Sequence, residues 1–361
     1  MVRTRFFQDR NTGSFPVGAA VKILGIETSC DETSIAVLET KNNKVEVLSN
    51  IVSSQVKIHA PYGGVVPSLA AREHEKNLKP VFEKALKEAG AKMAEIDLIT
   101  VTQGPGLEIA LWKGINFAKE LSNRYKKPLL GINHLEAHIY SNFFKNNKIK
   151  YPALNLIVSG GHTQLVLMTA HGKFKIIGET QDDAAGEAFD KVAKMMNLGY
   201  PGGPIVSKLA EKGNPKKFQL PRPMLNQKNY NFSFSGLKTA VLYLLKDLGK
   251  INEKIVADIC ASFQQAVIDV LVQKTIKAAK EYKSKSILLS GGVSANKLLR
   301  KTLEREAKKL KMFYSQPDLQ YTGDNAAMIA LAGYYKSKKF KLKSLKFKDL
   351  IAEPDLKIKN W

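Results

Sequence analysis

Two histidines four residues apart, His134 and His138, have a spacing that indicates chemistry. They lie in NHLEAH, a segment with helical character. Because an α-helix has about 3.6 residues per turn, both imidazoles would share one face and could bind one metal ion. Histidines at this spacing also cap helices, stack on rings or face solvent, so the pair alone leaves these roles open.

A carboxylate is the third ligand that we expect, and our candidate is Asp324 in YTGDNAAMIA. This residue stands at the predicted N-terminus of a helix, where aspartate also serves as a cap, so the sequence leaves both roles open. A zinc peptidase would carry glutamate directly after the first histidine, and here that position is Leu135. Glu136 lies about 200° around the helix from each histidine, and we expect it to point away from the metal.

Two SGG turns each follow a predicted strand: residues 159–161 after NLIV and residues 290–292 after SILL. Glycine lets the backbone approach a phosphate and turn its N–H groups toward it. Glycine pairs also form ordinary hairpin turns. Their repetition at matching strand ends favours a nucleotide site.

A third glycine-rich element, YPGGP, follows the acidic segment DDAAGEAFDKVAK. Asp190 in that segment could accept hydrogen bonds from ribose hydroxyls, and the alternative is a charged, solvated helix face. Gly186 would cost about 1 kcal/mol in a helix interior, which indicates close packing or a ligand at this point.

Acidic residues also gather in ETSCDETS, which the pattern places in the turn of the first hairpin. An exposed acidic turn needs no function. A carboxylate of this turn that faces a bound acyl group could instead act as a general base, and Asp31 and Glu32 are both candidates.

The chain of 361 residues is long enough for two packed cores. Its formal net charge of +23 indicates a polyanionic partner such as nucleic acid, although lysines scattered along a lysine-rich chain give the same excess. Two distant cysteines indicate neither a disulfide framework nor a thiolate zinc site. Without a continuous apolar segment or a signal-like beginning, we expect a soluble, cytoplasmic protein with no membrane association.

The order of predicted elements is a hairpin followed by mixed α/β structure, repeated once. We expect long helices at residues 68–89, 107–125, 252–281 and 295–310. This pattern predicts a pseudo-duplicated α/β protein with a ligand-binding cleft between its halves. The expected divisions are a flexible extension at 1–20, an N-terminal lobe at 21–147, a C-terminal lobe at 148–335 and a basic tail at 336–361.

Together these segments resemble the TsaD family. Ten motifs occur in that family's order between Val21 and Ala332: ILGIETSCDET, YGGVVPSLAAREH, GPGL, NHLEAH, VSGGHTQL, DDAAGEAFDKVAK, YPGGP, FSFSGLKTAV, SGGVSAN and GDNAAMIA. The ETSCDET turn is similar to that of the bacterial and organellar branch.

The resemblance implies an actin-like, ASKHA-type fold with two pseudo-duplicated lobes and a central cleft. It implies transfer of a threonylcarbamoyl group from threonylcarbamoyl-AMP to N6 of adenosine 37, in tRNAs that read codons beginning with A. Bacterial members of the family work with TsaB, a shorter paralogue, and with the ATPase TsaE, so we expect tRNA and both proteins as partners.

The same resemblance implies roles for individual residues. His134, His138 and Asp324 look like ligands of one divalent metal, with iron favoured and zinc as the alternative. Asp31 looks like the catalytic base. The expected contacts to the adenylate are Ile157, Val158, Ser159, Gly160, Gly161, Asp190, Gly203 and Asn296.

Three other functions compete with this interpretation. A secreted glycoprotein endopeptidase is disfavoured by the position of Glu136 and the absence of a signal-like segment. An ATPase or kinase on the same fold would hold Mg²⁺ with phosphate and carboxylate oxygens, which leaves the two histidines unexplained. A non-enzymatic tRNA-binding scaffold would explain the charge but not the convergence of histidines, aspartates and glycine turns.

Overall fold

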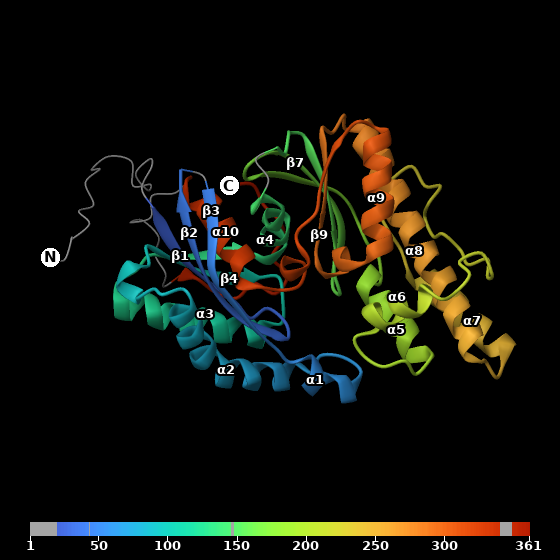
Figure 1. Cartoon of the computed structure of the whole chain (residues 1–361), viewed down its shortest axis with the longest axis horizontal. Helices are drawn as coiled ribbons and strands as arrows, with labels where there is room; N and C mark the ends of the chain where they lie inside the picture. The colour runs from blue at the N-terminus through green and yellow to red at the C-terminus, as the bar shows by residue number, and fades with distance from the viewer. Residues whose placement is uncertain (1–19, 43, 146–147, 340–348) are drawn as a thin grey trace.

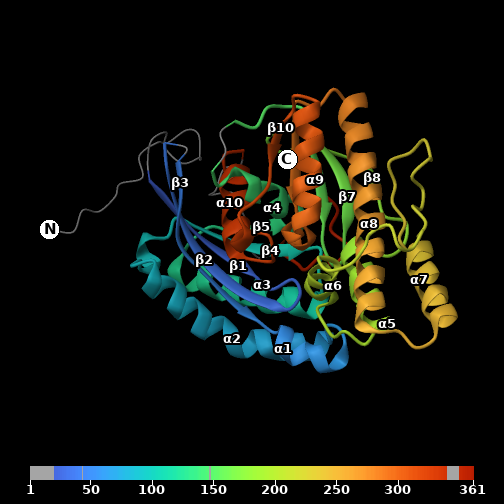
Figure 2. The ribbon, with the colours of Figure 1, turned by 45° about the vertical axis from the view of Figure 1, so that its right-hand side comes forward.

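The structure is a computed structural model that describes residues 20–42, 44–145, 148–339 and 349–361. Two five-stranded sheets lie side by side (Figures 1 and 2). Most of the expected extension at 1–20, the expected lobe boundary at 147 and part of the basic tail lie outside the described residues. The division of the chain into lobes therefore stays a prediction.

The first sheet has the strand order β3-β2-β1-β4-β5. Its first three strands form an antiparallel meander, and β4 and β5 continue the sheet parallel to β1. The strands are β1 (Val21–Glu27), β2 (Glu32–Lys41), β3 (Lys44–Ser54), β4 (Leu98–Gly104) and β5 (Leu129–Asn133).

The second sheet repeats this arrangement with the order β10-β9-β6-β7-β8. Again the first strand of the sheet is central, a meander extends to one side, and parallel strands extend to the other. The strands are β6 (Ala153–Val158), β7 (Thr163–Ala170), β8 (Lys173–Glu179), β9 (Ser286–Ser290) and β10 (Phe313–Ser315). The predicted duplication of an α/β unit is confirmed.

Helices cover both faces of each sheet, which explains why the central strands β1 and β6 are buried along almost their whole length. Two neighbouring residues of β1 point to opposite faces of the sheet: Leu24 packs with α2 and α3, and Ile23 packs with α10. The helices are α1 (Val56–His59), α2 (Pro67–Glu88), α3 (Glu108–Tyr125), α4 (His134–Tyr140), α5 (Ala185–Met195), α6 (Gly202–Ala210), α7 (Ser235–Leu248), α8 (Glu253–Glu281), α9 (Lys297–Lys309) and α10 (Ala326–Ser337). Short 3₁₀ helices lie at Ala60–Tyr62, Met93–Glu95, Ser141–Phe143, Gly292–Ala295 and Leu319–Tyr321.

One apolar core is shared by the two sheets. It contains Ile23 and Ile132 from the first sheet, Ile157 and Leu288 from the second, and residues of α4 and α10. A buried core of this kind fixes α4 and α10 relative to both sheets, because close-packed interiors tolerate little displacement.

The helix α8 is long and apolar enough to cross a membrane by length and composition. In the described structure, however, 78% of its most apolar window is buried, in a core that also contains α5, α6 and β6. Its hydrophobicity is therefore accounted for by packing within the protein.

Candidate metal and nucleotide site

The helix α4 carries His134 and His138 and begins where β5 ends. Its N-cap is Asn133, whose side-chain oxygen accepts hydrogen bonds from the backbone N–H groups of Leu135 and Glu136. Every residue of the helix is buried. The two imidazole rings contact each other edge to face with centroids 4.6 Å apart, so the expected shared face is confirmed.

Asp324 lies opposite these histidines, at the beginning of α10. Its Oδ1 atom is 3.4 Å from Nε2 of His134 and 3.1 Å from Nε2 of His138. The helix is capped by the next residue, Asn325, whose side chain accepts from the backbone N–H of Met328. The capping role is thus filled by Asn325, and the carboxylate of Asp324 is free to face the imidazoles.

Glu27, at the end of β1, lies at the other ring nitrogen of His134. Its Oε2 atom is 2.9 Å from Nδ1 of His134 and also accepts from the hydroxyl of Thr102 at 2.6 Å. Its Oε1 atom accepts from the backbone N–H of Ser29. A carboxylate that accepts from Nδ1–H leaves the Nε2 lone pair directed toward Asp324, as in many metal-bound histidines.

The pKa shifts of these groups follow from burial and from their opposite charges. Burial alone would lower the pKa of His134, but Asp324 and Glu27 outweigh it and raise that pKa well above its usual value. Burial works against the ionised form of Asp324, yet the two histidines lower its pKa. Burial lowers the pKa of His138. Without a metal, the raised pKa of His134 favours its doubly protonated, cationic ring, whose charge opposes those of Asp324 and Glu27.

The residues fit a divalent cation. The three ligand atoms lie within 4.8 Å of one another. Metal–ligand bonds of about 2.0–2.2 Å place neighbouring ligands roughly 3–3.5 Å apart, close to the two distances from Asp324. One carboxylate, two imidazoles and the orienting Glu27 match the donors that iron and zinc accept.

The two SGG turns meet at one edge of the second sheet. The strands that precede them, β6 and β9, are parallel neighbours with Ile157 opposite Ser290. In the first turn Gly160 and Gly161 are exposed, and Ser159 is partly buried. The carboxyl ends of parallel strands are where α/β sheets bind ligands, so this edge suits a nucleotide phosphate.

The close packing expected at Gly186 is confirmed. In α5 this glycine lies against the first SGG turn, and its backbone N–H donates to the carbonyl of Ser159 at 3.1 Å. A β-carbon at Gly186 would lie 2.6 Å from the Ser159 carbonyl oxygen and 2.9 Å from backbone atoms of Gly160. The absent side chain allows α5 to support the turn.

The other expected nucleotide contacts already have partners within the protein. Asp190 accepts from the backbone N–H of Gly202 at 2.7 Å and also from that of Gly203. Asn296 caps α9, and its amide nitrogen donates to Ser207 and Gln264.

Ile157 and Val158 are fully buried in β6, so their side chains belong to the cores of the protein. The adenylate contacts expected for Ile157, Val158, Asp190 and Asn296 stay predictions.

The acidic turn between β1 and β2 reaches the second half of the chain. Burial raises the pKa of Tyr200, and the nearby carboxylates of Asp31 and Asp190 add to the rise. Burial, Asp324 and Asp31 also raise the pKa of Glu32 well above its usual value. The turn therefore lies near both Asp324 and the YPGGP segment.

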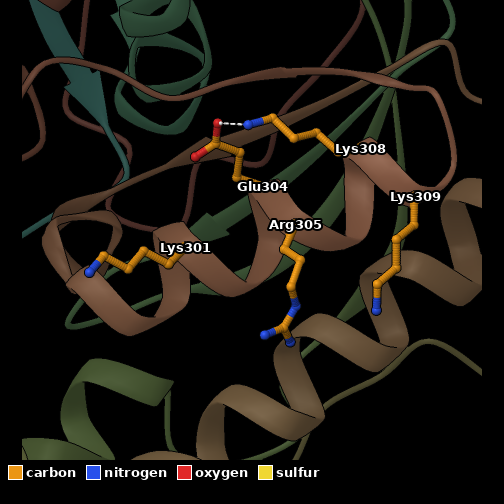
Figure 3. Close-up of a pocket in the computed structure, with 5 residues that line it drawn as sticks. All are labelled: Lys301, Glu304, Arg305, Lys308 and Lys309. Carbon is orange, nitrogen blue, oxygen red and sulfur yellow. Dashed lines mark ion pairs between the residues drawn. The ribbon is translucent and has the colours of Figure 1, made fainter.

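A separate shallow hollow of about 410 Å³ lies on α9 and contains none of these site residues (Figure 3). It is lined by Lys301, Glu304, Arg305, Lys308 and Lys309, and Lys308 pairs with Glu304 at 2.9 Å. Long surface cations paired with glutamates on one helix are typical of a solvated face, and we assign no catalytic role to them.

Comparison with known proteins gives the family. The sequence matches TsaD, described as tRNA N6-adenosine threonylcarbamoyltransferase, over residues 46–331. A protein of that name from Thermosipho melanesiensis is 52% identical over 312 residues, covering 86% of this chain and 94% of the relative. One from Bacillus subtilis is 53% identical over 313 residues, covering 86% and 89%. The chain belongs to the TsaD family.

Membership of TsaD makes the chain a transferase that modifies tRNA, and tRNA is the polyanion that its positive charge suggested. The peptidase, kinase and scaffold interpretations are not supported by these relatives. Among solved structures, the crystal structure of T. kodakarensis HypF matches with a TM-score of 0.58 and 16% identity, over 94% of this chain and 50% of that one. This likeness concerns the fold alone, and the chain has the expected actin-like α/β fold with two mixed sheets.

Proposed function

We propose that this TsaD protein transfers the threonylcarbamoyl group of threonylcarbamoyl-AMP to N6 of adenosine 37, in tRNAs that read codons beginning with A. The observation that carries the proposal is the convergence of His134, His138 and Asp324 next to the acidic turn of Asp31. A cluster of this kind in a member of the tRNA N6-adenosine threonylcarbamoyltransferase family supports a metal-dependent reaction centre.

The metal ligands in this proposal are the two Nε2 atoms and the carboxylate of Asp324, with Fe²⁺ favoured and Zn²⁺ as the alternative. The chemistry that such a metal supplies is Lewis-acid polarisation of a carbonyl or phosphate oxygen of the donor. Glu27 holds the ring of His134 in the required orientation through its hydrogen bond to Nδ1.

The adenylate part of the donor would lie at the edge formed by the two SGG turns. The backbone N–H groups of Gly160 and Gly161 can donate hydrogen bonds to a phosphate. The missing side chain of Gly186 allows the first SGG turn to pack closely against α5. Asp190 would act here by holding the N-terminus of α6, where Gly203 lies, in place beside the donor.

Asp31 is the base in this proposal. A bond forms between N6 of the adenine and the carbamoyl carbon, and the bond from that carbon to the phosphate oxygen breaks. The amine proton passes to the Asp31 carboxylate, and AMP leaves with the electron pair of the broken bond. Glu32 is less suited, because a raised pKa favours its neutral form, which accepts protons poorly.

We further propose a TsaB-like paralogue and a TsaE-like ATPase as partners, and the cytoplasm as location, because unmodified tRNA is found there. The test is single-turnover transfer from preformed threonylcarbamoyl-AMP, with both partners present, to an unmodified tRNA. We expect modified adenosine by mass spectrometry with A37, and none with a tRNA in which A37 is replaced by G. Equal product from both tRNAs would contradict the proposed position.

A further inference from the structure

Glu136 is the acidic residue of NHLEAH that the metal site does not use. It lies on α4 between the two histidines, and only 3% of the residue's surface is exposed. Its Oε2 atom accepts a hydrogen bond of 2.8 Å from the indole Nε1–H of Trp361, and its carboxylate also accepts from the backbone N–H of Lys359. The back of the helix is thus held by residues more than two hundred positions away in sequence.

These partners belong to residues 349–361, which we name the strap. The strap also holds the beginning of α4, because Asn133, its N-cap, donates from Nδ2 to the carbonyl of Leu356 at 3.0 Å. Two further hydrogen bonds join Glu353 to Gln103 at the end of β4. The end of the chain lies between the two sheets, near α4 (Figure 1).

The strap is fixed to the second sheet as well. The backbone N–H of Trp361 donates to the carbonyl of Gly172 at 3.0 Å, and Asn360 accepts from the backbone N–H of Phe174 at 2.6 Å. Glycines mark the places of closest approach. A β-carbon on Gly172 would meet the Trp361 ring, and one on Gly104 would meet the carbonyl of Glu353.

We propose that the strap positions the metal-ligating helix α4 from behind, through the contact between Trp361 and Glu136. Trp361 and Glu136 are positioning residues, because neither touches the reacting atoms. The inference rests on the proposed function, in which His134 and His138 are ligands. Removing a group that orients a metal ligand typically lowers the metal affinity by about 10–100-fold.

The test compares Trp361→Phe with Trp112→Phe in the full chain. Phenylalanine keeps a ring against Gly172 but has no N–H for Glu136. Trp112 is partly buried on α3, in a different core, and serves as the matched control. We would measure Zn²⁺ affinity by competition with a chelating dye, and amide hydrogen exchange of residues 131–142 in the metal-free protein.

We expect Trp361→Phe to weaken Zn²⁺ binding by roughly ten-fold and to accelerate exchange in α4, whereas Trp112→Phe changes neither. Glu136→Leu should match Trp361→Phe, and Glu136→Gln should retain near-normal affinity because its amide oxygen still accepts from the indole. The double variant Glu136→Leu with Trp361→Phe should bind Zn²⁺ no more weakly than either single variant. Both single variants remove the same contact, so combining them removes nothing further.

Zn²⁺ affinity and α4 exchange that stay at wild-type values in both Trp361→Phe and Glu136→Leu would overturn the proposal. A fall in melting temperature alone, with both readouts unchanged, would overturn it too. If Trp361→Phe did not fold, Glu136→Leu and Glu136→Gln would carry the comparison. A wild-type chain that bound no Zn²⁺ would refute the metal site itself, and the exchange comparison would still decide the role of the strap.

Discussion

Nδ1 of His134 lies 2.9 Å from Oε2 of Glu27, while Nε2 of the same ring faces Asp324 at 3.4 Å. The two ring nitrogens therefore have separate roles. Nδ1 forms the hydrogen bond to a buried carboxylate that orients the ring, and Nε2 is available as a metal ligand. Glu27 is itself held by Thr102 and by the backbone of Ser29. The orientation of His134 is fixed by the first sheet.

Replacing Glu27 should weaken metal binding without removing a ligand. We expect Glu27→Ala to lower Zn²⁺ affinity by about 10–100-fold, because the His134 ring loses the acceptor that sets its tautomer. Glu75→Ala is the control, since Glu75 forms an exposed ion pair with Lys113. Equal Zn²⁺ affinity in Glu27→Ala and the control, measured by dye competition, would refute this role.

The two carboxylates of the acidic turn should differ in their effect on the chemical step. We expect Asp31→Asn to lower the single-turnover transfer rate by about 10²–10⁴-fold, the range of general base catalysis. Glu32→Gln should have a much smaller effect, because the amide resembles the neutral carboxyl group that the raised pKa of Glu32 favours. The opposite ranking at saturating donor and tRNA would make Glu32 the base.

Gly186→Ala should disturb the first SGG turn. The new methyl group would clash with the Ser159 carbonyl, and overpacking of this kind costs about 1–3 kcal/mol. We expect weaker binding of AMP, measured by calorimetry, together with lower stability. Gly236→Ala in α7 is the matched control, because nothing lies within 4 Å of a β-carbon there. Unchanged AMP affinity in Gly186→Ala would show that this turn does not bind the nucleotide.

The lowered pKa of His171 should make the protein less stable at acidic pH. Burial, with Lys338 and Lys339, lowers its pKa to about 4 from 6.5. The unfolded chain therefore binds a proton below pH 6.5 that the folded chain takes up only near pH 4, so stability is lost as the pH falls through that window.

Between pH 7 and 5 we expect the wild type to lose about 1–2 kcal/mol more than His171→Phe in urea unfolding. Phenylalanine keeps the stacking on Tyr140 and Tyr335 but cannot titrate. Parallel pH dependences of the two proteins would show that His171 does not contribute.

Much of the fold follows from the sequence because its long helices and buried strands are strongly patterned. The helices expected at 68–89, 107–125, 252–281 and 295–310 are α2, α3, α8 and α9, with ends that differ by at most two residues. The helices α6 and α7 were not predicted. Glycine, proline and serine fill their first turns, and these residue types also indicate loops.

The site was predicted less completely than the fold. Residue types and family resemblance identified His134, His138 and Asp324, and the structure brings their ligand atoms together. The role of Glu27 was missed, although a carboxylate at the end of an apolar strand is a signal of a buried, paired acid. The contact of Glu136 with Trp361 spans 225 residues, and no local pattern encodes it.

The most direct test of the central claim is the metal content of the purified protein, measured by inductively coupled plasma mass spectrometry beside its transfer activity with partners, donor and tRNA. We expect one equivalent of iron or zinc in the wild type and in His171→Phe, and loss of both metal and modified adenosine in His134→Ala, His138→Ala and Asp324→Ala. Folded variants that retained metal and product would contradict the account.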